Sequence, residues 1–371
     1  MKFRIAGDPM LDLLNAIIFI ILLYGFLPTY NAQYKNHSLK YGETPNFIFY
    51  GFFLILLSVL GFSDVDFFGY YQSYAAIRHG FNSKIVEPFY NFLSGILPNY
   101  FLWRLVVWGT AAILMLKTLK KLPVNTVYVL TFITLFYVFS FYKLRNALGF
   151  SVMFYGATLA LTSHHKYGKR IIGIVLIALS FYLHKSMIIS MALLSVYFIK
   201  FSKARINISL IAWPFLLGAV TLLLNSVVSG ELFGSDDQGF ASKAVGYASG
   251  EAMQSNLNGQ IRLAFENLAI IFPLAYMTWK IVYKKIAIPK VINFFYKYWY
   301  VTCYIAYLFA FQDSSSWIYI RFNTMAYFPM CVVLGWYFTF YRRNVWQKAI
   351  LIAALIPYAF SIFYLILKKV L

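Results

Sequence analysis

One histidine and two carboxylates are the side chains in this sequence that are best suited to proton transfer. His184 lies in the segment LSFYLHKSMIIS, and Asp66 and Glu87 lie within residues 63–93. An imidazole has an ordinary pKa of about 6.5, so it can take or give a proton near neutral pH. Asp66 and Glu87 are rivals for that role, because the chain holds only 12 acidic residues. These residue types predict acid–base chemistry, with His184 as the first candidate.

Three arginines could bind a multiply charged anion. Arg145 lies in SFYKLRNALGF, Arg321 in SSSWIYIRFNTMAYF, and Arg262 at the start of an apolar segment. An arginine inside or beside a long apolar segment is costly unless it reaches water or meets an anion. Its planar guanidinium matches the oxygens of a phosphate group. We therefore expect these arginines to bind phosphate, with a simple interfacial position as the alternative for Arg145.

Aromatic residues recur beside the two carboxylates. Tyr70, Tyr74 and Tyr90 stand at spacings that place aromatic rings along one face of short helices at a membrane surface. Such faces pack well against sugar rings, which makes these tyrosines candidates for glycan binding. An ordinary aromatic belt at the membrane interface is an equally good interpretation.

Several common types of catalytic site have no motif in this sequence. Cys303 and Cys331 both lie in apolar segments, without the spacing of metal ligands, and there is no HExxH sequence. A glycine loop for phosphates and a GxSxG turn are also missing. The expected chemistry uses neither a metal nor a cofactor.

The composition shows which elements must position these residues. Of the 371 residues, 61% are hydrophobic and 12% are charged, against about 45–50% and about 25% in soluble proteins. The chain is therefore expected to be an integral membrane protein. Because its apolar segments are continuous rather than alternating, they predict helices and not a β-barrel.

Twelve apolar segments are candidate membrane helices within a single all-α polytopic domain covering residues 1–371. They lie at about 10–28, 46–62, 99–116, 124–142, 146–163, 171–183, 187–199, 206–228, 263–283, 291–311, 317–340 and 349–367. The pair at 171–183 and 187–199 is short for full spans, so these two helices are either tilted or re-entrant.

The formal net charge of +20 is explained by orientation in the membrane. Lysine and arginine gather in alternate short loops, which the positive-inside rule makes cytoplasmic. The opposite face holds two longer loops, at about 63–98 and 229–262, and every acidic residue except Glu43. All the candidate site residues fall on that face. Since the basic residues are scattered between apolar segments, a nucleic-acid partner is not expected.

Short motifs in this order resemble the EpsG family, which is related in role to the Wzy polymerases of O-antigen and capsule. They are DFxxYxxxY from Asp66, EPFY from Glu87, LRNAL around Arg145, HKS from His184, and the late Arg321. The resemblance runs from about residue 60 to about residue 325.

The resemblance implies a glycosyltransferase that polymerises oligosaccharide repeat units carried on undecaprenyl diphosphate, at the outer face of the cytoplasmic membrane. Besides this glycan substrate and the surrounding membrane lipid, it implies a flippase and a chain-length regulator as partners. Arg145, Arg321 and Arg262 would then bind the diphosphate, and His184, Asp66 or Glu87 would be the base. The alternatives are a multi-spanning glycosyltransferase that uses a lipid-phosphate sugar, an O-antigen ligase, and a flippase or transporter.

Overall fold

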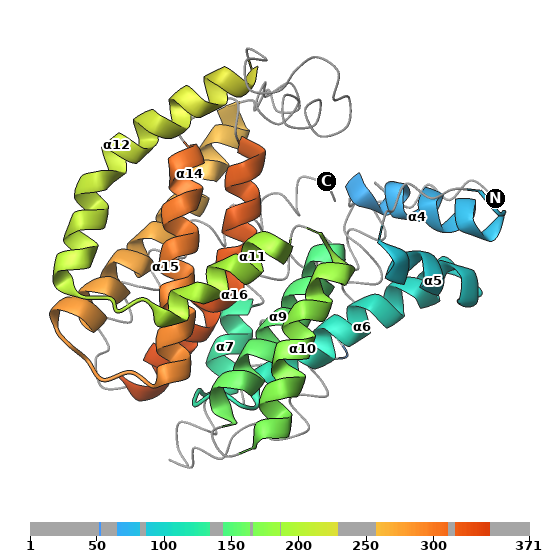
Figure 1. The fold of residues 1–371 in the computed structure, drawn as a ribbon, viewed down its shortest axis with the longest axis horizontal. Helices are drawn as coiled ribbons and strands as arrows, with labels where there is room; N and C mark the ends of the chain where they lie inside the picture. Colours follow the sequence, from blue (N-terminus) through green and yellow to red (C-terminus); the bar gives the residue numbers. More distant parts are fainter. Residues whose placement is uncertain are drawn as a thin grey trace.

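The computed structural model describes residues 52, 65–81, 87–133, 144–163, 166–185, 187–228, 257–310 and 316–341, and this part of the chain is all helical. The predicted all-α class is confirmed. The α-helices are α4 (Val65–Arg78), α5 (Pro88–Ile96), α6 (Tyr100–Leu119), α7 (Thr126–Phe132), α9 (Leu144–Thr162), α10 (Tyr167–Leu183), α11 (Met187–Leu193), α12 (Lys203–Val228), α14 (Leu257–Thr278), α15 (Lys290–Ala310) and α16 (Ser316–Phe340) (Figure 1). A 3-10 turn, η2 (Leu194–Phe198), continues α11, and a π turn, η3 (Trp279–Tyr283), continues α14.

Two of the described helices are long and apolar enough to cross a membrane. They are α6 and the first 18 residues of α12, Lys203–Val220. Most of the other described helices coincide with predicted spans: the segment expected at 317–340, for example, is α16, Ser316–Phe340. The expected spans at 10–28, 46–62 and 349–367 lie outside the described residues.

Helices α9 and α10 form a hairpin that is held together by a glycine contact. A Cβ on Gly173 would lie 2.5 Å from the carbonyl oxygen of Gly156, and a Cβ on Gly156 would lie 2.6 Å from the carbonyl oxygen of Gly173. Only glycine at both positions lets the two backbones approach so closely. Small residues are the usual means by which membrane helices pack, because van der Waals contact replaces the hydrophobic effect there.

Helices α15 and α16 form a second hairpin, against which α7 packs. Gly335 of α16 leaves the space that the Val129 side chain of α7 occupies. The hydroxyl of Thr339 accepts a hydrogen bond from the backbone N–H of Asn125, 2.8 Å away, at the start of α7. These contacts place α7 and the second half of α16 in the most buried part of the molecule.

Helix α12 lies at the periphery and curves around α14 and α15 (Figure 1). In the most apolar 18-residue segment of α12 only 6% is buried, against 56% in that of α6. Near the start of α12, the Ser209 hydroxyl lies 2.9 Å from the Tyr300 hydroxyl, and Tyr304 donates to the Ser209 carbonyl oxygen at 2.6 Å. An apolar helix with so little cover is suited to a lipid environment.

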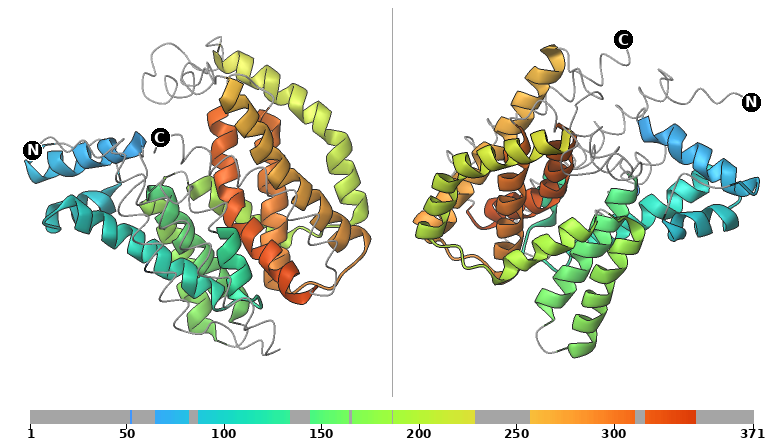
Figure 2. Two further views of the ribbon diagram at one scale, coloured as in Figure 1. Left: turned by 180° about the vertical axis from the view of Figure 1, so that it is seen from behind. Right: turned by 45° about the horizontal axis from the view of Figure 1, so that its top comes forward.

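Helices α4 and α5 lie together at the side of the molecule opposite α12 (Figures 1 and 2). The Tyr74 hydroxyl of α4 donates to the Leu97 carbonyl oxygen at 2.8 Å, and Arg78 donates to the Gly95 carbonyl oxygen at 3.3 Å. The predicted loop at 63–98 is therefore largely helical. The predicted loop at 229–262 lies mostly outside the described residues, and α14 begins within it at Leu257.

Candidate functional site

The sequence candidates His184 and Glu87 are in direct contact. His184 Nδ1 lies 3.1 Å from Glu87 Oε1, although the two residues are 97 positions apart in the chain. The Glu87 side chain is 4% exposed and the His184 side chain is 17% exposed. The carboxylate is thus enclosed while the imidazole keeps some accessible surface. A histidine backed by a buried carboxylate is a common arrangement for a general base.

Glu87 owes its position to the start of α5. It is the N-cap residue of that helix, with Pro88 following at the first helical position, where proline is favoured. An N-cap side chain usually accepts a hydrogen bond from its own helix, but Glu87 makes no such bond. Its carboxylate contacts His184 instead, while remaining at the helix end that favours negative charge.

His184 owes its position to the end of α10. It is the C-cap residue, and its backbone N–H donates to the Ser180 carbonyl oxygen at 3.1 Å. An ionised Glu87 carboxylate can only accept, and with it in that form the proton of the contact belongs to Nδ1 of His184. In the neutral ring Nε2 is then the atom that can accept a proton.

Helix α11, which begins just after His184, contacts α9 and α16 close to the turns that carry Arg145 and Arg321. A Cβ on Gly149, one turn after Arg145 in α9, would lie 2.9 Å from Cγ of Met187, which closely follows His184. One turn further along α11, the Ser190 hydroxyl donates to Met325 Sδ at 3.3 Å.

Met325 lies one turn after Arg321 in α16, so the beginnings of α9 and α16 both lie beside α11. The side chains of Arg145 and Arg321 lie outside the described part of the structure, and their binding of phosphate remains a prediction.

Arg262 lies at the same end of the bundle as Arg321. Near the opposite end, the Tyr276 hydroxyl of α14 lies 2.8 Å from the Tyr337 hydroxyl of α16. Arg262 and Arg321 precede these tyrosines by about four helical turns in their respective helices, at about 5.4 Å of rise per turn. The side chain of Arg262 is also outside the described part, as is that of Asp66 in the first turn of α4.

The three tyrosines expected to meet the glycan are buried. Tyr70, Tyr74 and Tyr90 are 6%, 7% and 0% exposed. The Tyr90 and Tyr70 rings pack against Trp103 of α6, with centroids 6.0 Å and 6.3 Å away. Burial raises the pKa of the Tyr74 hydroxyl, while nearby Arg78 acts to lower it. In this structure the rings therefore fix α4 and α5 to α6 and do not present an open face to a sugar.

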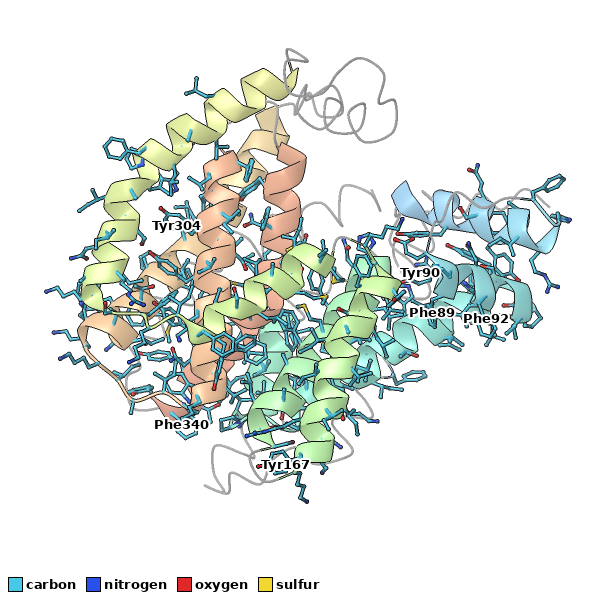
Figure 3. All side chains as sticks on the ribbon, viewed as in Figure 1. Phe89, Tyr90, Phe92, Tyr167, Tyr304 and Phe340 are labelled. Carbon is cyan, nitrogen blue, oxygen red and sulfur yellow. The ribbon has the colours of Figure 1, made fainter. Side chains whose placement is uncertain are left out.

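Other aromatic residues of this region are exposed. Phe81, Phe92 and Phe101 are 70%, 65% and 41% exposed, and Figure 3 shows Phe92 on α5 near Phe89 and Tyr90. The Arg104 side chain of α6, by contrast, is fully buried, with its guanidinium carbon 5.8 Å from the centre of the Tyr100 ring. In the sequence, the feature that points to Arg104 is its position among apolar residues near the start of the span predicted at 99–116.

Comparisons with known proteins identify the family. Searches of curated proteins and of solved structures gave no match. The EpsG family model matches residues 45–370, which is most of the chain and includes all the candidate site residues. That family is membrane associated and is linked to polysaccharide biosynthesis. The chain therefore belongs to the EpsG family.

Proposed function

We propose that this protein is a polysaccharide polymerase that joins oligosaccharide repeat units carried on a polyprenyl diphosphate such as undecaprenyl diphosphate. The observation that carries the proposal is the contact between His184 and the buried Glu87 carboxylate. Helix α11, which follows His184, contacts α9 and α16 about one turn after Arg145 and Arg321. A base and a cluster of cations are the two elements that this transfer reaction needs.

The proposed reaction is a displacement at the anomeric carbon of the growing chain. A hydroxyl oxygen of the incoming repeat unit bonds to that carbon, and its proton passes to Nε2 of His184. The bond between the anomeric carbon and the diphosphate oxygen breaks, and its electron pair leaves with the lipid diphosphate. Glu87 stabilises the imidazolium that forms and keeps the ring in position through Nδ1.

The arginines act on the leaving group in this proposal. Negative charge grows on the diphosphate as its bond to the sugar breaks, and guanidinium groups at that position stabilise the transition state more than the ground state. Arg145 and Arg321 are the first candidates, and Arg262 is the third. Because the lipid diphosphate already activates the sugar, the proposed reaction uses no nucleotide.

The distribution of basic loops supports a site on the outer face of the cytoplasmic membrane. There it would receive lipid-linked units from a flippase and act together with a regulator of chain length. Asp66 remains a rival base. It lies at the start of α4, the helix that packs against α5, and Glu87 is the N-cap residue of α5.

The proposal is tested by gel electrophoresis of the surface polysaccharide from a deletion strain carrying single variants. We expect His184→Ala, Arg145→Ala and Arg321→Ala each to leave single repeat units without a ladder of longer chains. The matched control is Lys185→Ala, because Lys185 is exposed and adjacent to His184. Immunoblots of membrane fractions establish that each variant is inserted.

The deletion strain itself separates the alternatives. Loss of a polymerase leaves complete single units at the surface, whereas loss of a lipid-phosphate-dependent glycosyltransferase leaves truncated units. Loss of a flippase leaves none at the surface, and loss of a ligase leaves long chains that stay on the lipid carrier. Normal ladders from all three variants would overturn the assignment.

A further inference from the structure

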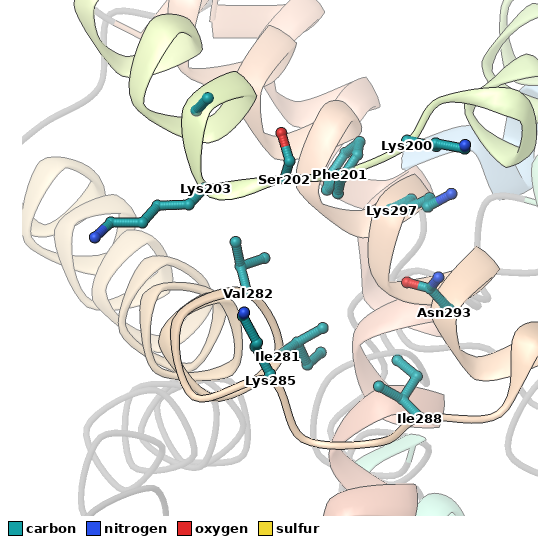
Figure 4. Close-up of a pocket in the computed structure, with 11 residues that line it drawn as sticks. Lys200, Phe201, Ser202, Lys203, Ile281, Val282, Lys285, Ile288, Asn293 and Lys297 are labelled. Atoms are coloured by element: carbon teal, nitrogen blue, oxygen red, sulfur yellow. The ribbon is translucent and has the colours of Figure 1, made fainter.

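A pocket of about 740 Å³ opens at the basic end of the bundle, away from the His184–Glu87 pair (Figure 4). It lies between the segment that leads from η2 into α12, the end of α14, and the start of α15. Four lysines line it: Lys200, Lys203, Lys285 and Lys297. Because the sequence has no aspartate or glutamate in residues 197–230 or 267–312, these segments supply no carboxylate to neutralise the lysines.

The wall of the pocket is apolar. Phe201, Ile281, Val282 and Ile288 line it together with the polar side chains of Ser202 and Asn293. A free inorganic anion would gain nothing from such a wall, whereas the first carbons of an acyl chain would be sheltered there. The combination of positive charge and apolar surface matches an anionic amphiphile.

Two of the lysines are held in place by described contacts. The Lys297 residue is 8% exposed, and its ammonium donates to the carbonyl oxygens of Tyr197 and Ile199, the latter just after the end of η2. This anchors the segment that forms one side of the pocket. Lys203 on the rim lies with its ammonium 5.5 Å from the centre of the Tyr283 ring.

Lys285 supplies an independent indication that its side chain has a role. Its φ angle is +52°, in the left-handed region that glycine adopts without cost and that other L-residues seldom adopt. The position closes the end of α14 and η3, where the Ile286 N–H donates to the Lys280 carbonyl oxygen at 3.2 Å. Glycine would serve the turn better, so the turn does not explain the lysine. Figure 4 shows its side chain directed toward the space below residues 200–203.

We propose that this pocket binds the headgroup of an anionic phospholipid from the membrane leaflet at this end of the bundle, with phosphatidylglycerol as the chemical type. The Lys285 ammonium binds the phosphate, the other three lysines add positive charge around the pocket, and the apolar wall shelters the nearest part of the acyl chains. This site is separate from the proposed polymerase site and does not depend on it. It would fasten α12, which is otherwise little covered, to α14 and α15.

The test uses the full-length protein in detergent and measures binding of dioctanoyl phosphatidylglycerol by native mass spectrometry. The key variant is Lys285→Gly, which removes one charge and also relieves the backbone. A lysine near a lipid surface contributes about 1 kcal/mol, which corresponds to about fivefold in affinity. We expect Lys285→Gly to weaken binding about fivefold while its melting temperature without lipid stays equal or rises. Lys285→Arg should keep the affinity.

Binding of two further ligands distinguishes an anionic phospholipid from an uncharged lipid and from free phosphate. Dioctanoyl phosphatidylcholine tests for chains without net charge, and inorganic phosphate tests for the anion alone; both should bind much more weakly than phosphatidylglycerol. Lys284→Gln is the control, because Lys284 is adjacent but does not line the pocket. Equal binding by Lys285→Gly and the unmodified protein, equal binding of both lipids, or displacement of the lipid by equimolar phosphate would each overturn the proposal.

Discussion

Replacing Glu87 by glutamine tests whether the buried carboxylate assists proton acceptance by His184. Glutamine has nearly the same shape and can still accept a hydrogen bond through its amide oxygen, so the substitution removes mainly the charge. The side chain is 4% exposed and its oxygen lies 3.1 Å from Nδ1, so water screens the interaction little. A variant that fills the same space should remain folded.

The magnitude follows from the chemistry of the pair. Hydrogen bonds to charged groups contribute about 1.5–3 kcal/mol, roughly twice as much as neutral ones. A full imidazolium–carboxylate attraction at 3.1 Å would be on the order of 5 kcal/mol at an effective dielectric constant of about 20, which sets an upper bound. Because glutamine keeps a neutral hydrogen bond, about half of this contribution, about 0.8–1.5 kcal/mol, is lost in the transition state, and the polymerisation rate falls about 4- to 12-fold.

The assay is the rate at which membranes that carry labelled lipid-linked repeat units form longer chains. Ser94→Ala is a matched control within α5, because the Ser94 hydroxyl bonds only to the Tyr90 carbonyl oxygen of its own helix among its described contacts. We expect this control to retain its rate and both variants to retain their melting temperatures within a few degrees. A folded Glu87→Gln protein with an unchanged rate would refute the role given to the pair.

Three other predictions concern the helices that support the site. Gly173→Val should lower the free energy of unfolding by about 1–3 kcal/mol through overpacking against α9, whereas Gly168→Ala should not, because a Cβ there meets nothing within 4 Å; thermal unfolding in detergent measures both. Thr339→Val should cost about 1 kcal/mol in the same assay, because it leaves a backbone N–H at the start of α7 without its acceptor. Cys303 and Cys331 are both fully buried, so neither should react with a maleimide until the protein is denatured; labelling of the folded protein, read by mass spectrometry, would contradict the packing of α15 and α16.

Helix positions could be predicted because continuous apolar segments bounded by charges leave few alternatives. The span expected at 99–116 begins within one residue of α6, Tyr100–Leu119, whose Asn99 side chain accepts a hydrogen bond from the Leu102 N–H at 2.8 Å. The segment expected at 206–228 begins earlier, at Lys203, because that lysine and Arg205 continue the helix beyond the apolar part. The charged residues therefore marked the boundary of the apolar segment and not the boundary of the helix.

The contacts within the site were less accessible to sequence reasoning. His184 and Glu87 were both predicted candidates, but 97 positions separate them and no periodicity relates them. For the tyrosines, the helix could be predicted from the sequence but its buried side could not. Their spacing correctly placed Tyr70 and Tyr74 on one helix, but which side of that helix is buried depends on Trp103, from another helix. The binding of phosphate by Arg145, Arg262 and Arg321 and the role of Asp66 stay predictions.

The contact between Glu87 and His184 joins two pairs of helices that are otherwise separate in the chain. Glu87 belongs to the helical layer of α4 and α5, and His184 belongs to the tightly packed α9–α10 hairpin. The histidine therefore has its carboxylate only while that layer is seated against the bundle. Under the proposed function, a substitution that loosens the packing of α5 against α6 should therefore slow polymerisation although it changes neither Glu87 nor His184.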